Sequence, residues 1–163
     1  MPDRPDFTAH WSELEDPEPQ CYPGDTEAMA FDASLGRKLG LTRIGIHHVR
    51  LPPGRRTSYP HAESAEEEFV FVVEGRPDVW IDGVLHPLSP GDSVAFPAGT
   101  GICHTFLNNS REEVRLLVVG EKQKAENRVR YPLNEAFEQS TAYGWTDAPP
   151  RALGPHDGRA RIE

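Results

Sequence analysis

Short apolar runs separated by turn residues follow one another through the middle of this chain. The runs recur at intervals of about 8 to 14 residues, a spacing typical of strands in a sandwich or barrel. They cover residues 41–51, 68–73, 78–81, 93–97, 102–107 and 114–119. Between them, Asp82-Gly83 is favoured in two-residue hairpins, and Ser89-Pro90-Gly91-Asp92 suits a type II turn. This spacing of short apolar runs and turn residues predicts an all-β sandwich or barrel.

The two ends of the chain differ from this middle part. At 163 residues, the chain is long enough for one domain with its own core. Residues 1–40 are acidic and rich in Pro and Gly, and we expect them to form an arm wrapped on the domain. We expect the barrel to span residues 41–131 and a C-terminal extension to span residues 132–163, with a polar, partly disordered end. A short helix is expected around residues 134–143, with Asn134 as its N-cap.

Composition narrows the partners and the compartment. The formal net charge of −9 argues against nucleic acid and against an anionic membrane surface, since both attract basic patches. No apolar run approaches the roughly 20 residues that span a bilayer, and the first residues show no apolar signal segment. Cys21 and Cys103 make no disulfide framework. We therefore expect a cytoplasmic protein whose partner is a small molecule.

An unusual cluster of charge precedes one of the predicted strands. Residues 60–75 carry five glutamates beside His61, although like charges side by side are normally destabilising. By strand alternation, His61 and Glu63 share a face, Glu68 begins the next strand, and His104 lies on a later one. If these four positions converge inside a barrel, two nitrogen and two oxygen donors suit a divalent first-row metal. The metal would neutralise the two carboxylates.

The predicted strand at residues 68–73 is apolar on both faces. Val70 and Val72 share the face of Glu68, and the opposite face carries Phe69, Phe71 and Val73. One face can fill a barrel, so the other needs a second cover. A partner subunit or the N-terminal arm could provide it, and we expect a homodimer.

Two segments of the chain resemble the two motifs of the cupin superfamily. The first family motif reads Gly, five residues, His-x-His, three or four residues, Glu, six residues, Gly. Here it is Gly54, six residues, His61-Ala-Glu63, four residues, Glu68, six residues, Gly75. The second reads Gly, five residues, Pro-x-Gly, two residues, His, three residues, Asn, and here it is Gly91, five residues, Pro97-Ala-Gly99, four residues, His104, three residues, Asn108. In detail the chain resembles small single-domain bacterial cupins of the sugar-phosphate-isomerase-like type.

This resemblance implies a double-stranded β-helix, the jelly-roll barrel of the cupins, holding one divalent ion of Mn, Fe, Ni or Zn. His61, Glu68 and His104 match three of the family's metal ligands. Glu63 stands where the family has its second histidine, and the resemblance makes it the fourth ligand. We expect Glu66 and Glu67 to be solvated charges outside the site.

The implied function is a metal-dependent isomerase or epimerase of a small sugar or sugar phosphate. Glu63 is the candidate catalytic base if it does not bind the metal, and Tyr59, on the face of His61, is a second catalytic candidate. Arg50, Arg55 or Arg56 could meet a phosphate. Two alternatives stay open. One is an oxygenase, for which two histidines and one carboxylate suffice, and the other is a non-catalytic cupin that binds a metabolite.

Two adjacent histidines cannot both face the barrel interior. His47 and His48 lie in one predicted strand, and alternation sends only one of them inward. The sequence does not choose between them. An inward histidine here is more often part of a pocket wall than a ligand.

Overall fold

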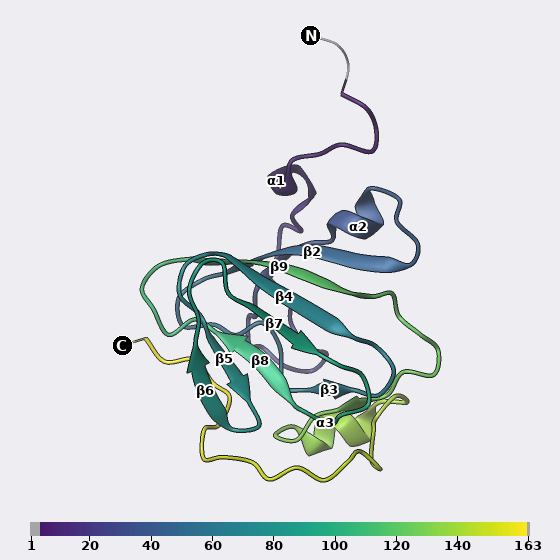
Figure 1. Ribbon diagram of the computed structural model, residues 1–163, viewed down its shortest axis with the longest axis vertical. Coiled ribbons are helices and arrows are strands. Elements are labelled where there is room, and N and C mark those ends of the chain that lie inside the picture. Colours follow the sequence, from purple (N-terminus) through teal and green to yellow (C-terminus); the bar gives the residue numbers. More distant parts are fainter. Residues whose placement is uncertain (1–3, 163) are drawn as a thin grey trace.

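The computed structural model describes residues 4–162, and the predicted all-β class is confirmed (Figure 1). Its helices are α1 (Trp11–Leu14), α2 (Leu35–Lys38) and α3 (Glu135–Ser140). Its strands are β1 (Phe31–Ala33), β2 (Ile44–Leu51), β3 (Ala62–Glu63), β4 (Glu68–Glu74), β5 (Asp78–Ile81), β6 (Val84–Pro87), β7 (Ser93–Phe96), β8 (His104–Leu107), β9 (Val114–Glu121) and β10 (Val129–Arg130). They form a five-stranded sheet in the order β1-β2-β9-β4-β7, a three-stranded sheet in the order β6-β5-β8, and the pair β10-β3.

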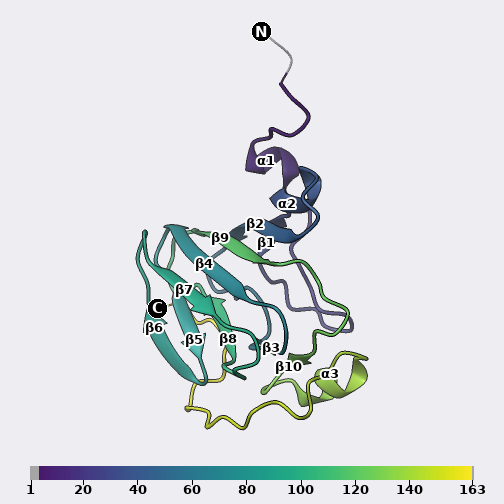
Figure 2. The same cartoon turned by 45° about the vertical axis from the view of Figure 1, so that its right-hand side comes forward.

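The two larger sheets face each other and enclose the main core (Figure 2). Alternation along β4 works as the sequence predicts: Val70 and Val72 point inward and are each 1% exposed. They pack with Leu116 of β9 and with Phe106 of β8, which comes from the opposite sheet. The buried face of each strand thus fills the space between the sheets, and the polar site residues can enter only near its open end.

Both predicted turns are present. Asp82 and Gly83 join β5 to β6 with positive φ angles of 45° and 89°, the conformation that a two-residue hairpin of type I′ requires. In the turn before β7, the amide of Asp92 donates to the carbonyl of Ser89 at 3.0 Å, and Gly91 has a φ of 97°.

The N-terminal segment contributes a strand that the sequence did not predict. β1 pairs antiparallel with β2, so that Asp32 lies opposite Val49 at the edge of the five-stranded sheet. Residues before it run along the same region, where the amide of Met29 donates to the carbonyl of Gln20 at 2.8 Å. This path brings Gln20 and Asp32 to the open end of the barrel.

The C-terminal segment is held against the three-stranded sheet, so the expectation of partial disorder at this end is wrong for the described residues. Trp145 is 6% exposed and packs on a core cluster with Trp80, whose indole nitrogen donates to the carbonyl of His156 at 2.8 Å. The guanidinium of Arg56 donates to the carbonyl of Gly158 at 3.0 Å. Hydrogen bonds of this kind could not be predicted from the sequence, because their partners lie far apart along the chain.

The helix expected near the C-terminus is shorter than predicted. α3 covers residues 135–140, and Asn134 occupies its N-cap position without a side-chain hydrogen bond to the helix.

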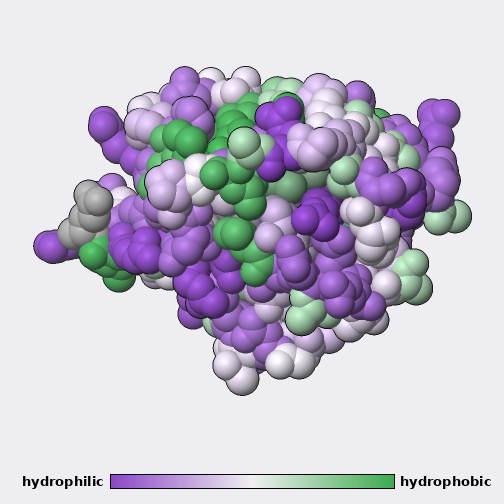
Figure 3. Space-filling view, turned by 90° about the horizontal axis from the view of Figure 1, so that it is seen from below, coloured by the Kyte–Doolittle hydropathy of each residue, from purple (hydrophilic) through white to green (hydrophobic). Residues whose placement is uncertain are grey.

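Seen from below, the surface is mostly hydrophilic, with hydrophobic residues in small patches (Figure 3). Both cysteines are free, and no helix within residues 4–162 has the length and hydropathy to cross a membrane.

Candidate metal centre

Main-chain pairing places two histidines side by side. His61, just before β3, forms an antiparallel bridge with His104 at the start of β8. Their backbones exchange two hydrogen bonds, of 3.1 and 2.9 Å, and their ring centroids lie 4.8 Å apart. Residues directly opposite in such a pair send their side chains to the same face. The backbone therefore fixes both imidazoles on the interior face.

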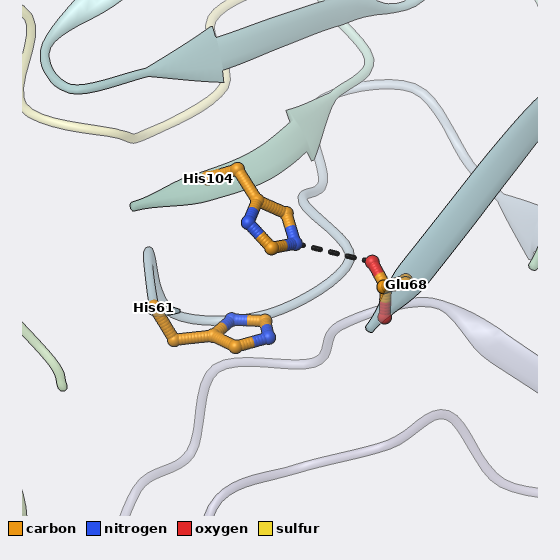
Figure 4. A group of neighbouring side chains, drawn as sticks. All are labelled: His61, Glu68 and His104. Carbon is orange, nitrogen blue, oxygen red and sulfur yellow. Dashed lines mark hydrogen bonds and ion pairs between the residues drawn. The ribbon is translucent and has the colours of Figure 1, made fainter. Parts of the chain in front are cut away.

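Glu68 completes the group from the facing sheet. It is the first residue of β4, and its Oε1 lies 3.1 Å from Nε2 of His104 (Figure 4). Among the described residues, His61, Glu68 and His104 form a group whose possible ligand atoms all lie within 4.8 Å of one another. The three residues that match the family's ligands are thus brought together.

His61 is prepared to act as a ligand. Its Nδ1 donates to the carbonyl of Tyr59 at 2.8 Å, which leaves Nε2 with a free lone pair. Burial, together with the neighbouring His104, lowers the pKa of His61 to about 4. The ring is therefore neutral at neutral pH, as metal binding requires.

His104 and Glu68 contact each other and have different surroundings from His61. The ring of His104 stacks on Phe96 with centroids 3.5 Å apart, and its Nδ1 is buried without a hydrogen-bond partner among residues 4–162. Burial raises the pKa of the Glu68 carboxyl, but the hydrogen bond and charge of His104 outweigh that effect, so the pKa lies below its ordinary value. Two imidazoles around one half-buried carboxylate fit Mn, Fe, Ni or Zn, and the donor set leaves room for further ligands.

Glu63 lies outside this group of three. It stands in β3, opposite Val129 of β10, and lines a narrow crevice with Glu66, Glu68 and His104. Burial, followed by the charges of Glu66 and Glu68, raises the pKa of Glu63 to about 7. Its assignment as a fourth ligand stays a prediction.

Two other predicted residues lie outside the group of His61, Glu68 and His104, although Glu66 lines the same crevice as Glu68 and His104. The ring of Tyr59 is 5% exposed and stacks on Tyr22 at 3.9 Å, and its hydroxyl donates to Asp25. Tyr59 contributes its carbonyl to the site, by orienting His61. Glu66 accepts a hydrogen bond from the backbone amide of Lys124.

His61, Glu68 and His104 line a cavity of about 200 Å³ with residues from the arm and from β2. Of the two adjacent histidines, His47 faces this cavity, whereas His48 turns outward and stacks on Trp11 at 4.3 Å. The polar lining further includes Gln20, Asp32, Thr57 and Ser58. None of these four residues was predicted from the sequence. Thr57 and Ser58 lie between Gly54 and His61 in the first motif, which was a usable signal, but nothing in the sequence connects Gln20 or Asp32 to the site.

The arginines suggested for a phosphate are engaged elsewhere. Arg50 pairs with Glu15 and Glu113, each at 2.8 Å. Arg56 is 2% exposed and pairs with Glu27 at 2.7 Å, and Arg55 donates to the carbonyl of Met29. None of these three arginines lines the cavity, so that expectation is wrong.

Comparison with known proteins identifies the domain. Residues 47–120 match the cupin domain family, and this stretch contains all three of the grouped ligands. The chain carries a cupin domain. The cupin interpretation of the two sequence motifs is thereby confirmed.

Three similar proteins place this cupin domain among its relatives. Over 94 residues, the chain is 35% identical to Protein SchB of Streptomyces halstedii and 33% identical to Polyketide synthase CurC of Streptomyces cyaneus. These matches cover 58% of this chain, but only 63% of SchB and 56% of CurC. A crystal structure of a cupin-superfamily sugar phosphate isomerase from Silicibacter pomeroyi is 36% identical, with a TM-score of 0.60 over 63% of this chain and 64% of that protein. The chain therefore spans less than two thirds of each of these relatives.

Proposed function

We propose that this cupin is a metal-dependent enzyme that moves a proton beside the carbonyl group of a small sugar or sugar phosphate, as an isomerase or epimerase. The observation that carries the proposal is the group of His61, Glu68 and His104, which opens into a cavity with a polar lining. The similar structure from Silicibacter pomeroyi, which is called a sugar phosphate isomerase, supports the same substrate class.

His61, Glu68 and His104 would hold the metal. When bound, a divalent cation would polarise the substrate carbonyl and stabilise the negative charge that develops on its oxygen. Thr57 and Ser58 offer hydroxyl groups to a polyol, and Val70 and Phe106 close the inner wall against water. The cavity volume of about 200 Å³ is below the range usual for drug-sized ligands and suits a small substrate.

The similarity to CurC adds a second class of carbonyl compounds to the candidate substrates. CurC is called a polyketide synthase, and polyketide chains carry carbonyl groups on alternate carbons. Removing a proton beside such a carbonyl is the same elementary step as the first step of sugar isomerisation. The reaction class is therefore proton transfer at the carbon beside a carbonyl group, and sugars or sugar phosphates are the preferred substrates.

The test is exchange of the proton beside the carbonyl. Protein loaded with Mn²⁺, Fe²⁺, Ni²⁺ or Zn²⁺ is incubated in deuterium oxide with a panel of aldose phosphates, ketose phosphates and one β-ketoacyl thioester. We expect NMR to show metal-dependent entry of deuterium at the carbon beside the carbonyl of at least one sugar phosphate. Absence of exchange over the whole panel would contradict the proposal.

One observation favours a second candidate, an oxygenase. The described donor group consists of two histidines and one carboxylate, the combination found in non-haem iron(II) oxygenases with open coordination positions. Oxygen uptake by the iron-loaded protein in the presence of the same panel separates the two. Uptake without deuterium exchange would support the oxygenase, and a cupin that only binds a metabolite would show neither.

A further inference from the structure

A second pair of polar side chains lies on the wall of the same cavity. His47 of β2 places its Nδ1 at 2.9 and 3.0 Å from the two carboxylate oxygens of Asp32 in β1. The Asp32 side chain is only 8% exposed, while that of His47 is 35% exposed. Both residues line the 200 Å³ cavity that contains the three grouped ligands. They also line a second cavity, of about 340 Å³, which lies beyond them near Arg37. The pair therefore stands between the candidate metal centre and the outside.

The other ring nitrogen of His47 is left available. The carboxylate of Asp32 accepts the Nδ1–H, so Nε2 carries the lone pair, and no described residue forms a hydrogen bond with it.

Gly45 keeps the space beside this nitrogen open. It stands two residues before His47 in β2, and a Cβ built on it would lie 3.4 Å from Nε2 of His47. A glycine within a strand weakens the strand, and it often marks a place where a ligand or another backbone approaches closely. Its φ is not among the positive ones, so turn geometry does not explain this glycine.

The electrostatics agree with this arrangement. The hydrogen bond to Asp32 raises the pKa of His47 and outweighs the opposing effect of burial. Glu68 adds to the increase, and Arg37 opposes it. A carboxylate on Nδ1 selects the tautomer with a basic Nε2 and stabilises the imidazolium that forms when Nε2 takes a proton.

We propose that His47 is the catalytic base of this cupin and that Asp32 is the residue that positions it. The inference rests on the proposed function and names the group that moves the proton. The C–H bond beside the substrate carbonyl breaks, its proton passes to Nε2 of His47, and its electron pair forms the carbon–carbon double bond of an enediolate. The former carbonyl π pair moves to oxygen. The proton on Nε2 exchanges with solvent, and Nε2 then donates a proton to the former carbonyl carbon. The proton of the adjacent hydroxyl passes to the former carbonyl oxygen as the new carbonyl forms on the adjacent carbon, with no change in oxidation state overall.

The experiment compares three variants of the metal-loaded full chain with a matched control, in the deuterium-exchange assay on the sugar phosphate panel. His47→Gln removes the base, and we expect exchange to fall about 10² to 10⁴-fold with metal content unchanged. The control His86→Gln makes the same change at an exposed histidine in β6, outside both cavities, and is expected to leave exchange within about twofold.

Asp32→Asn and Gly45→Ala separate a catalytic role from a structural one. Asp32→Asn is expected to lower kcat on the order of 10²-fold with little change in KM, and ¹⁵N NMR of His47 is expected to show loss of the single Nδ1–H tautomer. Gly45→Ala keeps both members of the pair but places a methyl group close to Nε2. It is expected to lower exchange about 10-fold or more while the tautomer of His47 stays unchanged.

The possible failures differ from one another. Wild-type exchange that persists undiminished in His47→Gln would overturn the role of His47 and leave the proposed function standing. Loss of metal from His47→Gln would show a structural role and overturn the inference as well. If the metal-loaded wild type exchanges no compound of the panel, the proposed function falls and this inference falls with it.

Discussion

The backbone fixes the direction in which the side chains of this site point. His61 and His104 face each other across an antiparallel bridge, so strand alternation alone sends both imidazoles inward. Spacing within the two motifs was enough to predict these histidines and Glu68. It could not predict Asp32, because the partner of Asp32 is a histidine in another strand, and Asp32 itself lies in a segment of only three strand residues.

Glu63 offers a pH-dependent test at this scale. Burial raises its pKa from 4.5 to about 7, so the folded protein holds this proton more tightly than the unfolded chain does. In metal-free protein, this group therefore stabilises the fold below pH 4.5, and the contribution is lost as the pH rises to about 7. We expect Glu63→Gln to reduce the fall in Tm between pH 5 and pH 7.5, measured by circular dichroism in the presence of a chelator.

The control for this measurement is Glu126→Gln, which makes the same change at an exposed glutamate. It should leave the pH dependence of Tm as in the wild type. Equal pH dependence in Glu63→Gln and the wild type would show that Glu63 is ionised in the fold from low pH.

At the scale of elements, long strands and tight turns were predictable and very short strands were not. β4 and β9 are runs of seven and eight residues rich in strand-forming Val, Leu and Phe, and the hairpin at Asp82-Gly83 has a local chemical signature. β3 and β10 have two residues each, too few for any periodicity to appear. These two short strands pair because contacts with distant parts of the chain fix the segments on either side of them. A local sequence pattern does not contain such contacts.

Asn108 shows how a motif residue can serve an element rather than the site. It is fully buried, and its side-chain nitrogen donates to the carbonyls of Leu51 at 2.8 Å and Glu112 at 2.7 Å. Its oxygen accepts a hydrogen bond from the hydroxyl of Ser110 at 2.7 Å. The side chain thus closes the turn between β8 and β9 and ties it to the end of β2.

Removing these bonds should cost stability and spare metal binding. We expect Asn108→Ala to lower the free energy of unfolding by about 2–4 kcal/mol, because buried carbonyls lose their partners. Urea denaturation followed by tryptophan fluorescence measures this change. Asn134→Ala is the matched control, since the side chain of Asn134 makes no capping hydrogen bond, and its effect should stay within about 0.5 kcal/mol. A loss of bound metal from folded Asn108→Ala would contradict the purely structural role.

In the whole molecule, residues 4–162 leave part of one sheet face exposed. On the outer side of β4, Phe69 is 41% exposed, Phe71 36% and Val73 47%. The N-terminal arm covers a different region, where Trp11 stacks on His48. Of the two covers that the sequence suggested for this face, the arm does not cover these residues within its described part, from residue 4 onward.

We therefore propose a second copy of the chain as the cover, which keeps the homodimer expected from the sequence. Light scattering at micromolar concentration is expected to give about twice the monomer mass of 18.2 kDa. Phe71→Lys should shift the protein to monomer, whereas Phe7→Lys, at a phenylalanine that is 74% exposed and remote from the sheet, should not. A wild type that is monomeric under these conditions would rule the dimer out.

Thermal unfolding of metal-free protein with added metal shows whether His61, Glu68 and His104 bind one divalent metal. Binding to the folded state alone stabilises by about 2.7 kcal/mol at 100 times the Kd, which corresponds to a rise in Tm of about 5–10 °C. We expect Mn²⁺, Fe²⁺, Ni²⁺ or Zn²⁺ to raise the Tm of the wild type and of Glu66→Ala, by an amount that grows with the metal concentration, and to leave His104→Ala and Glu68→Ala unchanged. If none of the four metals raises the Tm of the wild type, or if His104→Ala responds as the wild type does, these residues are not a metal centre.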